Sequence, residues 1–453
     1  MYFQEEKKRF LAVAANLIIL VFQARSFGYV WSNCYDSPYF FRGDYVVIAL
    51  YMAFVYLITK SFNGYKINYM RVSYLCVSHV VAIVLGGAVA YAFICMALNE
   101  YESIAPILAL VGVQILFTII WIVIVRTVQS YIYPPRQMVV IYGNYPPDDF
   151  LNKLDRKSDR YEIREILNYD EGYKKICQDI AAYEGVILYD LPSDERNSIL
   201  KFCYKNSIRT YVVPKITDIV MRESEELYLV DTPLFLARNQ GLHLDQRIVK
   251  RIMDIVVSLL GIVVLSPVML ITALVIKLYD KGPVLYKQIR FTRDKKTFTI
   301  YKFRSMSVNA EQKGARLASK GDSRITPIGR VIRRAHIDEI PQLFNVLKGD
   351  MSIVGPRPER PEIFEKYSKS IPEFDFRLKV KAGITGYAQV HGKYNTTPID
   401  KLKLDLVYIE RYSFLLDLKL MLLTLRIIFS KDSTEGIEAG QFTALSEGKN
   451  DRN

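Results

Sequence analysis

The chain has 453 residues, which is too long for one ordinary domain and predicts two or three folded units. Its 51% hydrophobic content and mean hydropathy of +0.10 favour a membrane protein, and apolar segments beside a formal net charge of +13 favour lipid and phosphate partners over nucleic acid. Five cysteines without a C-x-x-C spacing indicate neither a disulfide framework nor a zinc site, and four scattered histidines argue against a His-based metal site.

Four apolar runs predict a four-helix transmembrane bundle over residues 1–130; they cover about residues 10–22, 45–58, 72–98 and 104–125. The third and fourth runs reach the roughly 20 residues that a membrane crossing needs. The first two runs are shorter and reach that length only together with the residues beside them. A signal peptide is the rival interpretation of the first run, but no small-x-small cleavage site follows it. Lys and Arg before the first run, between the second and third, and after the fourth predict that the chain beyond residue 126 is cytoplasmic.

The middle segment, residues 136–240, has the pattern of a doubly wound, Rossmann-like α/β domain. Apolar strands are predicted at 138–142, 185–189 and 210–213, with helical stretches between them. A dinucleotide site needs several glycines where the first strand meets its helix, so that the backbone can approach a pyrophosphate. Here Gly143 is the only glycine of that turn. We therefore expect a structural or regulatory role for this domain, with nucleotide binding as the less favoured alternative.

Residues 255–278 form a further long apolar run that predicts a re-entrant helix-break-helix. Basic residues flank both ends of the run, which is the cytoplasmic signature on each side. Pro267 near the middle removes a backbone donor, and the Ser266 hydroxyl can satisfy the carbonyl that is left over. The alternative is a kinked helix that crosses the membrane, which would put the C-terminal half outside the cell, away from nucleotide substrates.

The residues that carry chemistry lie around an acidic pair, Asp338-Glu339. Such a dipeptide in isolation is usually solvated helix surface. Its neighbours favour phosphate chemistry, because carboxylates are poor nucleophiles toward phosphate unless a metal or nearby cations neutralise the charge. Arginine adds a bidentate fork for phosphate oxygens. The candidate cations for diphosphate contacts are Lys302, Arg304, Arg333 and Arg357, and surface charge or lipid headgroup contact is the alternative for each.

The sequences of three motifs, and their order along the chain, resemble those of a known protein family. Residues 298–306 read Phe-Thr-Ile-Tyr-Lys-Phe-Arg-Ser-Met, residues 338–341 form a D-E-x-P motif, and residues 355–358 read Gly-Pro-Arg-Pro. Residues 246–432 thus resemble the bacterial sugar transferase family, the monotopic polyprenyl-phosphate phosphoglycosyl transferases. The whole chain resembles the long-form members that initiate exopolysaccharide or capsule synthesis. The polar tail, 433–453, is predicted to be disordered.

The resemblance implies a reaction and its participants. A hexose-1-phosphate would move from a UDP-sugar to a polyprenyl phosphate such as undecaprenyl phosphate, giving a polyprenyl-diphospho-sugar and UMP at the cytoplasmic face of the bacterial inner membrane. Asp338 would attack the sugar-bearing phosphorus and form an acyl-phosphate, and Glu339 would help to hold Mg²⁺. Asp405 falls at a recurring family position in the substrate site, although helix capping or a salt bridge would also explain it. A homodimer in contact with membrane lipids is expected.

One departure from the family pattern, one ambiguous segment and one rival function remain. The family commonly has Ser or Thr and then Leu before the acidic pair, whereas this chain has His336-Ile337; a general acid or base role for His336 is possible but not required. The segment 404–429 mixes apolar and charged residues, which suits helices at the membrane interface or ordinary core packing equally. The rival function is a membrane scaffold of capsule assembly with a degenerate catalytic part, and the intact motifs argue against it.

Overall fold

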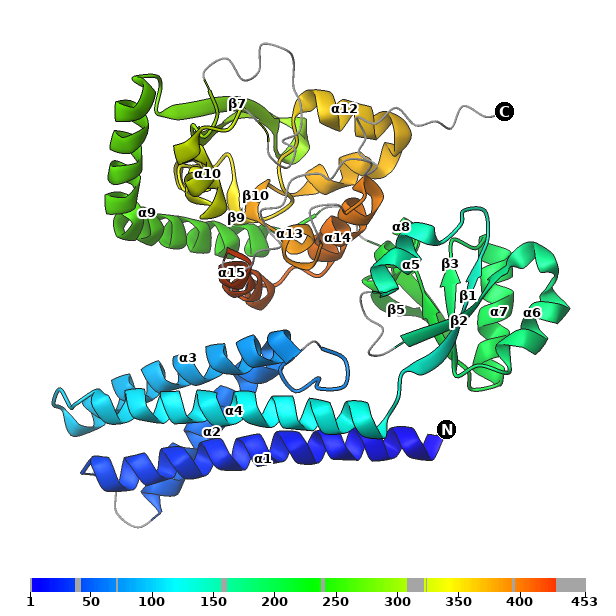
Figure 1. Cartoon of the computed structure of the whole chain (residues 1–453), viewed down its shortest axis with the longest axis horizontal. Helices are drawn as coiled ribbons and strands as arrows, with labels where there is room; N and C mark the ends of the chain where they lie inside the picture. The colour runs from blue at the N-terminus through cyan, green and yellow to red at the C-terminus, as the bar shows by residue number, and fades with distance from the viewer. Residues whose placement is uncertain are drawn as a thin grey trace. The chain divides into compact units, whose positions relative to one another are not determined.

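The computed structural model describes residues 2–36, 42–70, 72–155, 161–237, 241–307, 322, 324–392 and 396–428 (Figure 1). The chain divides into two compact units, Met1–Val213 and Pro214–Asn453. The first unit contains the N-terminal apolar helices and a parallel sheet. The second contains the long helix α9 and all of the motifs described above, while the polar tail lies outside the described residues.

The four apolar runs form four helices: α1 (Tyr2–Cys34), α2 (Gly43–Ser61), α3 (Val72–Leu98) and α4 (Ala105–Ile132). Helix α1 packs against α2 and α4, and α3 packs against the same two helices. The first two helices are longer than their apolar runs. Among the described residues, these four helices and α9 (Leu244–Asp280) are long and apolar enough to cross a membrane, which marks the chain as a membrane protein.

The rest of the first unit is a parallel four-stranded sheet with the strand order β2-β1-β3-β4. Its strands are β1 (Arg136–Tyr142), β2 (Tyr161–Asn168), β3 (Gly185–Tyr189) and β4 (Arg209–Val212). Helices α6 (Tyr173–Ile180) and α7 (Ser193–Lys205) cover one face, α5 (Asp148–Asp155) covers the other, and a 3₁₀ turn, η1 (Tyr169–Glu171), follows β2. Strand β2 was not predicted, because its sequence mixes charged residues with apolar ones.

Gly143, the single glycine at the end of β1, has a packing role. A Cβ atom there would lie 2.7 Å from the carbonyl oxygen of Asp190. That distance is well inside van der Waals contact, so only glycine fits without a shift of the backbone. At this turn Gly143 therefore packs closely against the backbone of Asp190.

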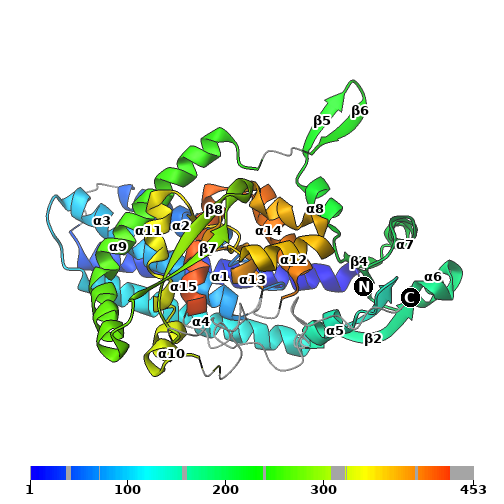
Figure 2. The same cartoon turned by 90° about the horizontal axis from the view of Figure 1, so that it is seen from above.

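The second unit begins with α8 (Ile216–Arg222) and an antiparallel hairpin, β5 (Glu225–Leu229) and β6 (Thr232–Leu236). All ten strand residues of this hairpin are exposed, and Figure 2 shows the hairpin extending away from the rest of its unit. Helix α8 and the hairpin thus belong to the same compact unit as α9, whereas the sequence predicted them to be part of the middle domain, residues 136–240.

Helix α9 is one long helix with Pro267 inside it. The Ser266 hydroxyl donates to the carbonyl oxygen of Val263 at 2.8 Å. That carbonyl is the one that the N–H of residue 267 would normally bind, so the serine replaces the hydrogen bond that proline cannot make. Figure 1 shows α9 as two straight segments joined by a bend. Most of its apolar side chains are exposed.

The remaining elements of the second unit follow α9 in the chain. The strands are β7 (Leu285–Phe291) and β8 (Thr297–Phe303), which form a hairpin, and β9 (Ser352–Val354) and β10 (Gly383–Thr385), which pair in parallel. The helices are α10 (Pro327–Arg334), α11 (Gln342–Lys348), α12 (Pro361–Ser370), α13 (Tyr387–His391), α14 (Pro398–Glu410) and α15 (Phe414–Ile428), with 3₁₀ segments η2 (Arg293–Lys295), η3 (Ile337–Glu339) and η4 (Pro372–Lys379). The segment expected to be helical near the C-terminus is α14 and α15.

Candidate active site

The acidic pair lies in a distorted connection between two helices. Helix α10 ends at Arg334, His336 has a φ of 53°, and Asp338 and Glu339 then occupy the short 3₁₀ segment η3. A left-handed conformation is uncommon for a residue other than glycine, so this turn is locally constrained. Pro341 stands at the N-cap of α11, so it begins a helix here. The break in regular helix lets two adjacent carboxylates face different surroundings.

Glu339 binds two cations from distant parts of the chain. Its Oε1 atom accepts from Lys302 Nζ at 2.7 Å and from Arg357 Nη2 at 2.7 Å. Lys302 belongs to β8, and Arg357 lies in the turn after β9. Burial alone would raise the pKa of Glu339, but the charges of Arg357 and Lys302 outweigh it and hold that pKa well below its usual range. Glu339 is therefore an ionised carboxylate held between two cations.

Asp338 is in a different electrostatic state. Among the described residues, no hydrogen bond or ion pair holds its carboxylate, although the charges of Lys302, Arg333 and His336 act on it. Burial raises the pKa of Asp338, the negative charge of Glu339 raises it further, and those three cationic groups only partly oppose the shift. The pair thus consists of one carboxylate engaged by cations and one whose oxygens are available to another group.

The turn that carries Arg357 is fixed by backbone contacts. Gly355 N–H donates to Thr385 O at 2.8 Å, and Gly383 N–H donates to Pro356 O at 2.9 Å. A Cβ atom at Gly355 would lie 2.4 Å from the carbonyl oxygen of Lys381, so only glycine allows this close approach to β10. The Gly-Pro-Arg-Pro sequence therefore forms a rigid turn against a neighbouring strand.

Two arginines, the buried Arg377 and the half-buried Arg290, bind backbone carbonyls of the same turn. Arg377 donates from Nη2 to the carbonyl oxygen of Arg357 at 3.1 Å, and Arg290 donates from Nη1 to Pro358 O at 3.0 Å. Burial lowers the pKa of Arg290 to about 10, which leaves it protonated at neutral pH. The guanidinium groups of both arginines thus fix the backbone from which the Arg357 side chain reaches Glu339.

Asp405 lies beneath this turn and outside the cluster around Glu339. It is 1% exposed on α14, and its Oδ2 accepts from Arg377 Nη2 at 2.7 Å and from Arg377 Nε at 3.0 Å. The structure thus shows Asp405 in a salt bridge, which was the alternative explanation for this residue, and its contact with substrate stays a prediction. Its partner Arg377 connects it to the backbone of Arg357.

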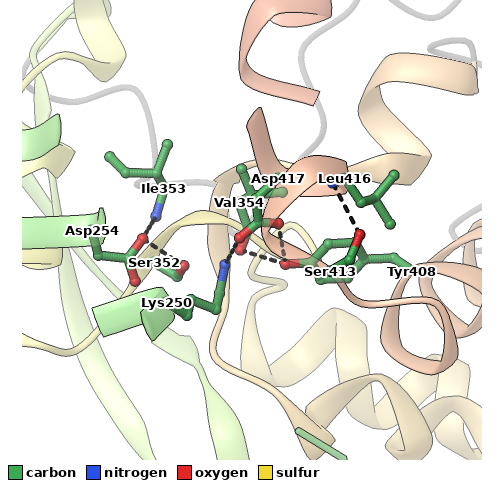
Figure 3. A network of polar contacts seen from close by, with 9 residues as sticks. All are labelled: Lys250, Asp254, Ser352, Ile353, Val354, Tyr408, Ser413, Leu416 and Asp417. Carbon is green, nitrogen blue, oxygen red and sulfur yellow. Dashed lines mark hydrogen bonds and ion pairs between the residues drawn. The ribbon is translucent and has the colours of Figure 1, made fainter. Parts of the chain in front are cut away.

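Helix α9 is joined to strand β9 through a buried carboxylate. Asp254 Oδ1 accepts from the Ser352 hydroxyl at 2.9 Å and from the backbone N–H of Ile353 at 2.9 Å. These residues begin the short strand that leads into the Arg357 turn, and Figure 3 shows Asp254 facing them. The apolar helix is thereby tied to the segment that positions one of the two cations on Glu339.

A second buried contact set ties α9 to α14 and α15. Lys250 Nζ lies 2.5 Å from Asp417 Oδ2, and the Tyr408 hydroxyl donates to Asp417 Oδ1 at 2.8 Å (Figure 3). The same hydroxyl lies 3.2 Å from the carbonyl oxygen of Val354 in β9. Because Lys250 and Asp417 are almost completely buried, this pair fixes the register of α9 against α15, within the second unit.

The other two predicted cations differ in their placement. Arg333, in the last turn of α10, is close enough for its positive charge to lower the pKa of Asp338. Arg304 is buried, and its guanidinium packs against Gly282, where a Cβ atom would lie 2.4 Å from Nη1. The structure thus brings Lys302, Arg333 and Arg357 together around the acidic pair and places Arg304 at the start of the β7–β8 hairpin.

Sequence reasoning missed Arg290, Arg377 and Asp254 as supporting residues. Asp254 lies directly before the apolar run 255–278 and makes its contacts about a hundred positions away, at Ser352 and Ile353. A charged residue at the start of a long apolar run was the available signal, because such residues are seldom buried without a partner.

The acidic pair has the donor chemistry of a magnesium site. Mg²⁺ prefers oxygen ligands and is commonly held by one or two carboxylates together with substrate phosphates. The Lys302 and Arg357 contacts both fall on Oε1 of Glu339, so Oε2 takes no part in them. Among the described residues no group of three or more His, Cys, Asp and Glu side chains gathers in one place, so phosphate oxygens would have to complete the ligand set.

Comparison with known proteins places the second unit in a family. Residues 245–431 match the family described as bacterial sugar transferase. The chain is 45% identical over 185 residues to a UDP-N-acetylgalactosamine-undecaprenyl-phosphate N-acetylgalactosaminephosphotransferase of Aeromonas hydrophila, covering 40% of this chain and 44% of that protein. It is 41% identical over 201 residues to a UDP-glucose:undecaprenyl-phosphate glucose-1-phosphate transferase of Escherichia coli, covering 43% and 42%.

A third relative is covered over most of its length. The UDP-glucose:undecaprenyl-phosphate glucose-1-phosphate transferase of Caulobacter vibrioides is 39% identical over 189 residues, which are 41% of this chain and 71% of that protein. The chain matches less than half of the length of the A. hydrophila and E. coli relatives. The matched residues include the acidic pair and the Arg357 turn. The chain therefore belongs to the bacterial sugar transferase family.

Proposed function

We propose that this chain is a phosphoglycosyl transferase that moves a hexose-1-phosphate from a UDP-sugar to undecaprenyl phosphate. The observation that carries the proposal is the asymmetry of the acidic pair: Glu339 is held by Lys302 and Arg357, while the adjacent Asp338 carboxylate makes no such contact among the described residues. Adjacent carboxylates in different electrostatic states suit a division into a nucleophile and a charge-binding group. The names of the relatives support the reaction class.

The proposed reaction has two displacements at one phosphorus atom. An Asp338 oxygen attacks the phosphorus that carries the sugar, and the bond from that phosphorus to the bridging oxygen breaks. UMP leaves with the bridging oxygen and its electron pair, and an aspartyl-phosphosugar remains. A phosphate oxygen of undecaprenyl phosphate then attacks the same phosphorus and displaces Asp338, which gives the lipid diphospho-sugar and restores the carboxylate.

The cations give the site its means of stabilising charge. Negative charge develops on the phosphoryl oxygens and on the leaving UMP in the transition state, so preorganised cations lower the barrier. Arg357 is half-exposed, with 47% of its side chain accessible, and so can reach a substrate as well as Glu339. The positive charge of Arg333 also acts on Asp338. Glu339 would hold Mg²⁺ with the substrate phosphates, and the bound ion would supply further charge neutralisation.

We place the site at the cytoplasmic face of the bacterial inner membrane. The loop charges support α1–α4 as a transmembrane bundle with basic ends on the cytoplasmic side. The Pro267 bend and the exposed apolar surface of α9 support a re-entrant helix that leaves by the side it entered. A homodimer and a Rossmann-like middle domain with a structural or regulatory role complete the proposal. The product would be the first lipid-linked intermediate of a polysaccharide.

The proposal is tested by identifying the nucleotide product. Full-length protein in detergent is given undecaprenyl phosphate, Mg²⁺ and a panel of UDP-glucose, UDP-galactose and UDP-N-acetylgalactosamine, and the panel identifies the sugar. UMP release with one of them is the expected result; release of UDP would indicate plain glycosyl transfer. Asp338→Asn should abolish UMP release without a change in unfolding midpoint, and Glu365→Gln, an exposed acidic residue on α12, is the matched control. No release with any sugar would favour the scaffold.

A further inference from the structure

A small cavity in the first unit lies where the ends of α1 and α4 meet the sheet. Its volume is about 60 Å³. The lining residues come from α1, from the connection between α2 and α3, from the end of α4 and from three strands. They are Lys8, Arg9, Asn68, Tyr69, Arg126, Gln129, Ser130, Tyr133, Pro134, Arg136, Tyr161 and Tyr211. None of them belongs to the acidic pair or its surroundings.

The lining consists largely of hydrogen-bond donors. Four of its side chains are cationic, and none of the described lining residues is acidic. The neutral members add amide, hydroxyl and phenol groups, each of which can also donate a hydrogen bond. Oxygen atoms of an anion match this composition, and arginine in particular binds phosphate oxygens through two parallel donors.

Contacts within the lining hold it in place. Gln129 is 2% exposed, and its Nε2 donates to Asn68 Oδ1 at 3.0 Å. Asn68 Nδ2 lies 3.4 Å from the carbonyl oxygen of Lys8, and Lys8 Nζ lies 5.1 Å from the centre of the Tyr133 ring. These contacts connect α1, the α2–α3 connection and α4. The donors are therefore positioned by the fold, which reduces the cost of ordering them around a ligand.

The size of the cavity limits the ligand. A single water needs about 10–15 Å³ of such space, so the cavity holds a few waters or a compact group such as a single phosphate. Pockets for whole small molecules are typically about 300–1,000 Å³, so a complete nucleotide does not fit. The ligand class is thus a phosphate group whose remaining part extends out of the cavity.

We propose that this cavity binds the phosphate of an anionic membrane phospholipid. The inference rests on the proposed orientation of α1–α4, which puts the cavity at the level of the cytoplasmic headgroups. Anionic lipids are found in that leaflet, and basic pockets at helix ends suit their headgroups. A lipid in this position would attach the sheet of the first unit to the membrane surface beside the transmembrane helices.

Native mass spectrometry of the full-length chain tests the proposal by counting the lipids that stay bound. The protein is released from micelles containing equal amounts of phosphatidylglycerol and phosphatidylcholine. We expect one retained phosphatidylglycerol. The variant Arg9→Gln/Arg126→Gln should bind it about thirtyfold more weakly, because each cation near the surface contributes about a fivefold change in affinity. Lys66→Gln, which removes an exposed cation at the same end of the bundle, should bind as the native protein does.

Two further measurements make the result decisive. Arg9→Gln alone changes an exposed position, so it should fold normally and lose about fivefold in affinity even if the double variant is unstable. Equal retention of both lipids, or equal losses in Lys66→Gln and Arg9→Gln, would overturn the proposal. If inorganic phosphate bound as tightly as phosphatidylglycerol, the cavity would be a site for soluble phosphate and the lipid proposal would be overturned.

Discussion

Replacing Asp405 by Asn tests whether this residue supports the site from below or binds substrate. The change keeps the size of the side chain and removes its charge. Arg377, whose side chain is 3% exposed, would lose its 2.7 Å partner, and its next nearest carboxylate is Glu359, with 3.7 Å between Nη1 and Oε1. Breaking a buried ion pair by removing one partner typically costs about 3–5 kcal/mol.

The expected result is a loss of stability together with a loss of activity. For a unit of this size, about 3–5 kcal/mol corresponds to a decrease of roughly 6–20 °C in the unfolding midpoint. Arg377 also donates to the backbone oxygen of Arg357, so its displacement should move that turn. Small misplacements of this kind can lower turnover by up to about a hundredfold. Thermal unfolding in detergent and UMP release per folded molecule measure the two effects.

Two comparison variants separate the explanations. Glu365→Gln makes the same charge change at an exposed position and should alter neither measurement. Arg357→Gln removes a half-exposed side chain, so it should reduce UMP release while the midpoint changes little. If Asp405→Asn unfolded at the same temperature as Glu365→Gln but lost its activity, Asp405 would contact substrate and the structural reasoning would be wrong.

Four further outcomes follow from the site and from α9. Lys302→Gln removes one of the two cations on Glu339 and should lower kcat/KM for UMP release about 10²–10³-fold, whereas an unchanged value would exclude Lys302 from charge stabilisation. The pKa of Asp338 is raised in part by the charge of Glu339, so Glu339→Gln should move the acidic limb of the residual kcat/KM profile to lower pH; a shift to higher pH would contradict that cause. Pro267→Ala restores a donor for the carbonyl of Val263 and should favour a straight, spanning α9, seen as altered sidedness of cysteine labelling after the helix; unaltered labelling would show that the bend has another cause. Removing Mg²⁺ with a chelator should stop UMP release and adding it back should restore release, while activity that survives chelation would remove the metal from the proposal.

The elements that could be predicted from the sequence are those with a clear apolar pattern. The apolar run 72–98 has the same bounds as α3, and the run 104–125 begins within one residue of α4, although α4 continues to Ile132. The strands near 138, 185 and 210 are present as β1, β3 and β4. Strand β2 was missed because charged residues alternate irregularly with its apolar ones, so the sequence lacks a strand period. Its place in the sheet is set by pairing with β1, which no local pattern reveals.

The candidate site also contains residues that could be predicted from the sequence and residues that could not. Lys302, Arg333 and Arg357 could be proposed because they stand in short motifs, and the fold brings them to the acidic pair across separations of up to 37 residues. The position of Asp405 depended on a long-range pairing with Arg377, which a sequence position cannot indicate. The left-handed turn at His336 was also unpredicted, because histidine has no strong preference for that conformation.

The arrangement around the acidic pair explains how one membrane helix can influence phosphate chemistry. A carboxylate attacks phosphorus poorly when cations occupy its own oxygens, and here the direct cation contacts fall on Glu339. Arg357 keeps that arrangement only while its turn stays in place, and Asp254 of α9 holds the strand that leads into the turn. A shift of α9 would therefore move Arg357, release Glu339 and change the charge that acts on Asp338. The apolar helix thus holds the strand that leads into the Arg357 turn.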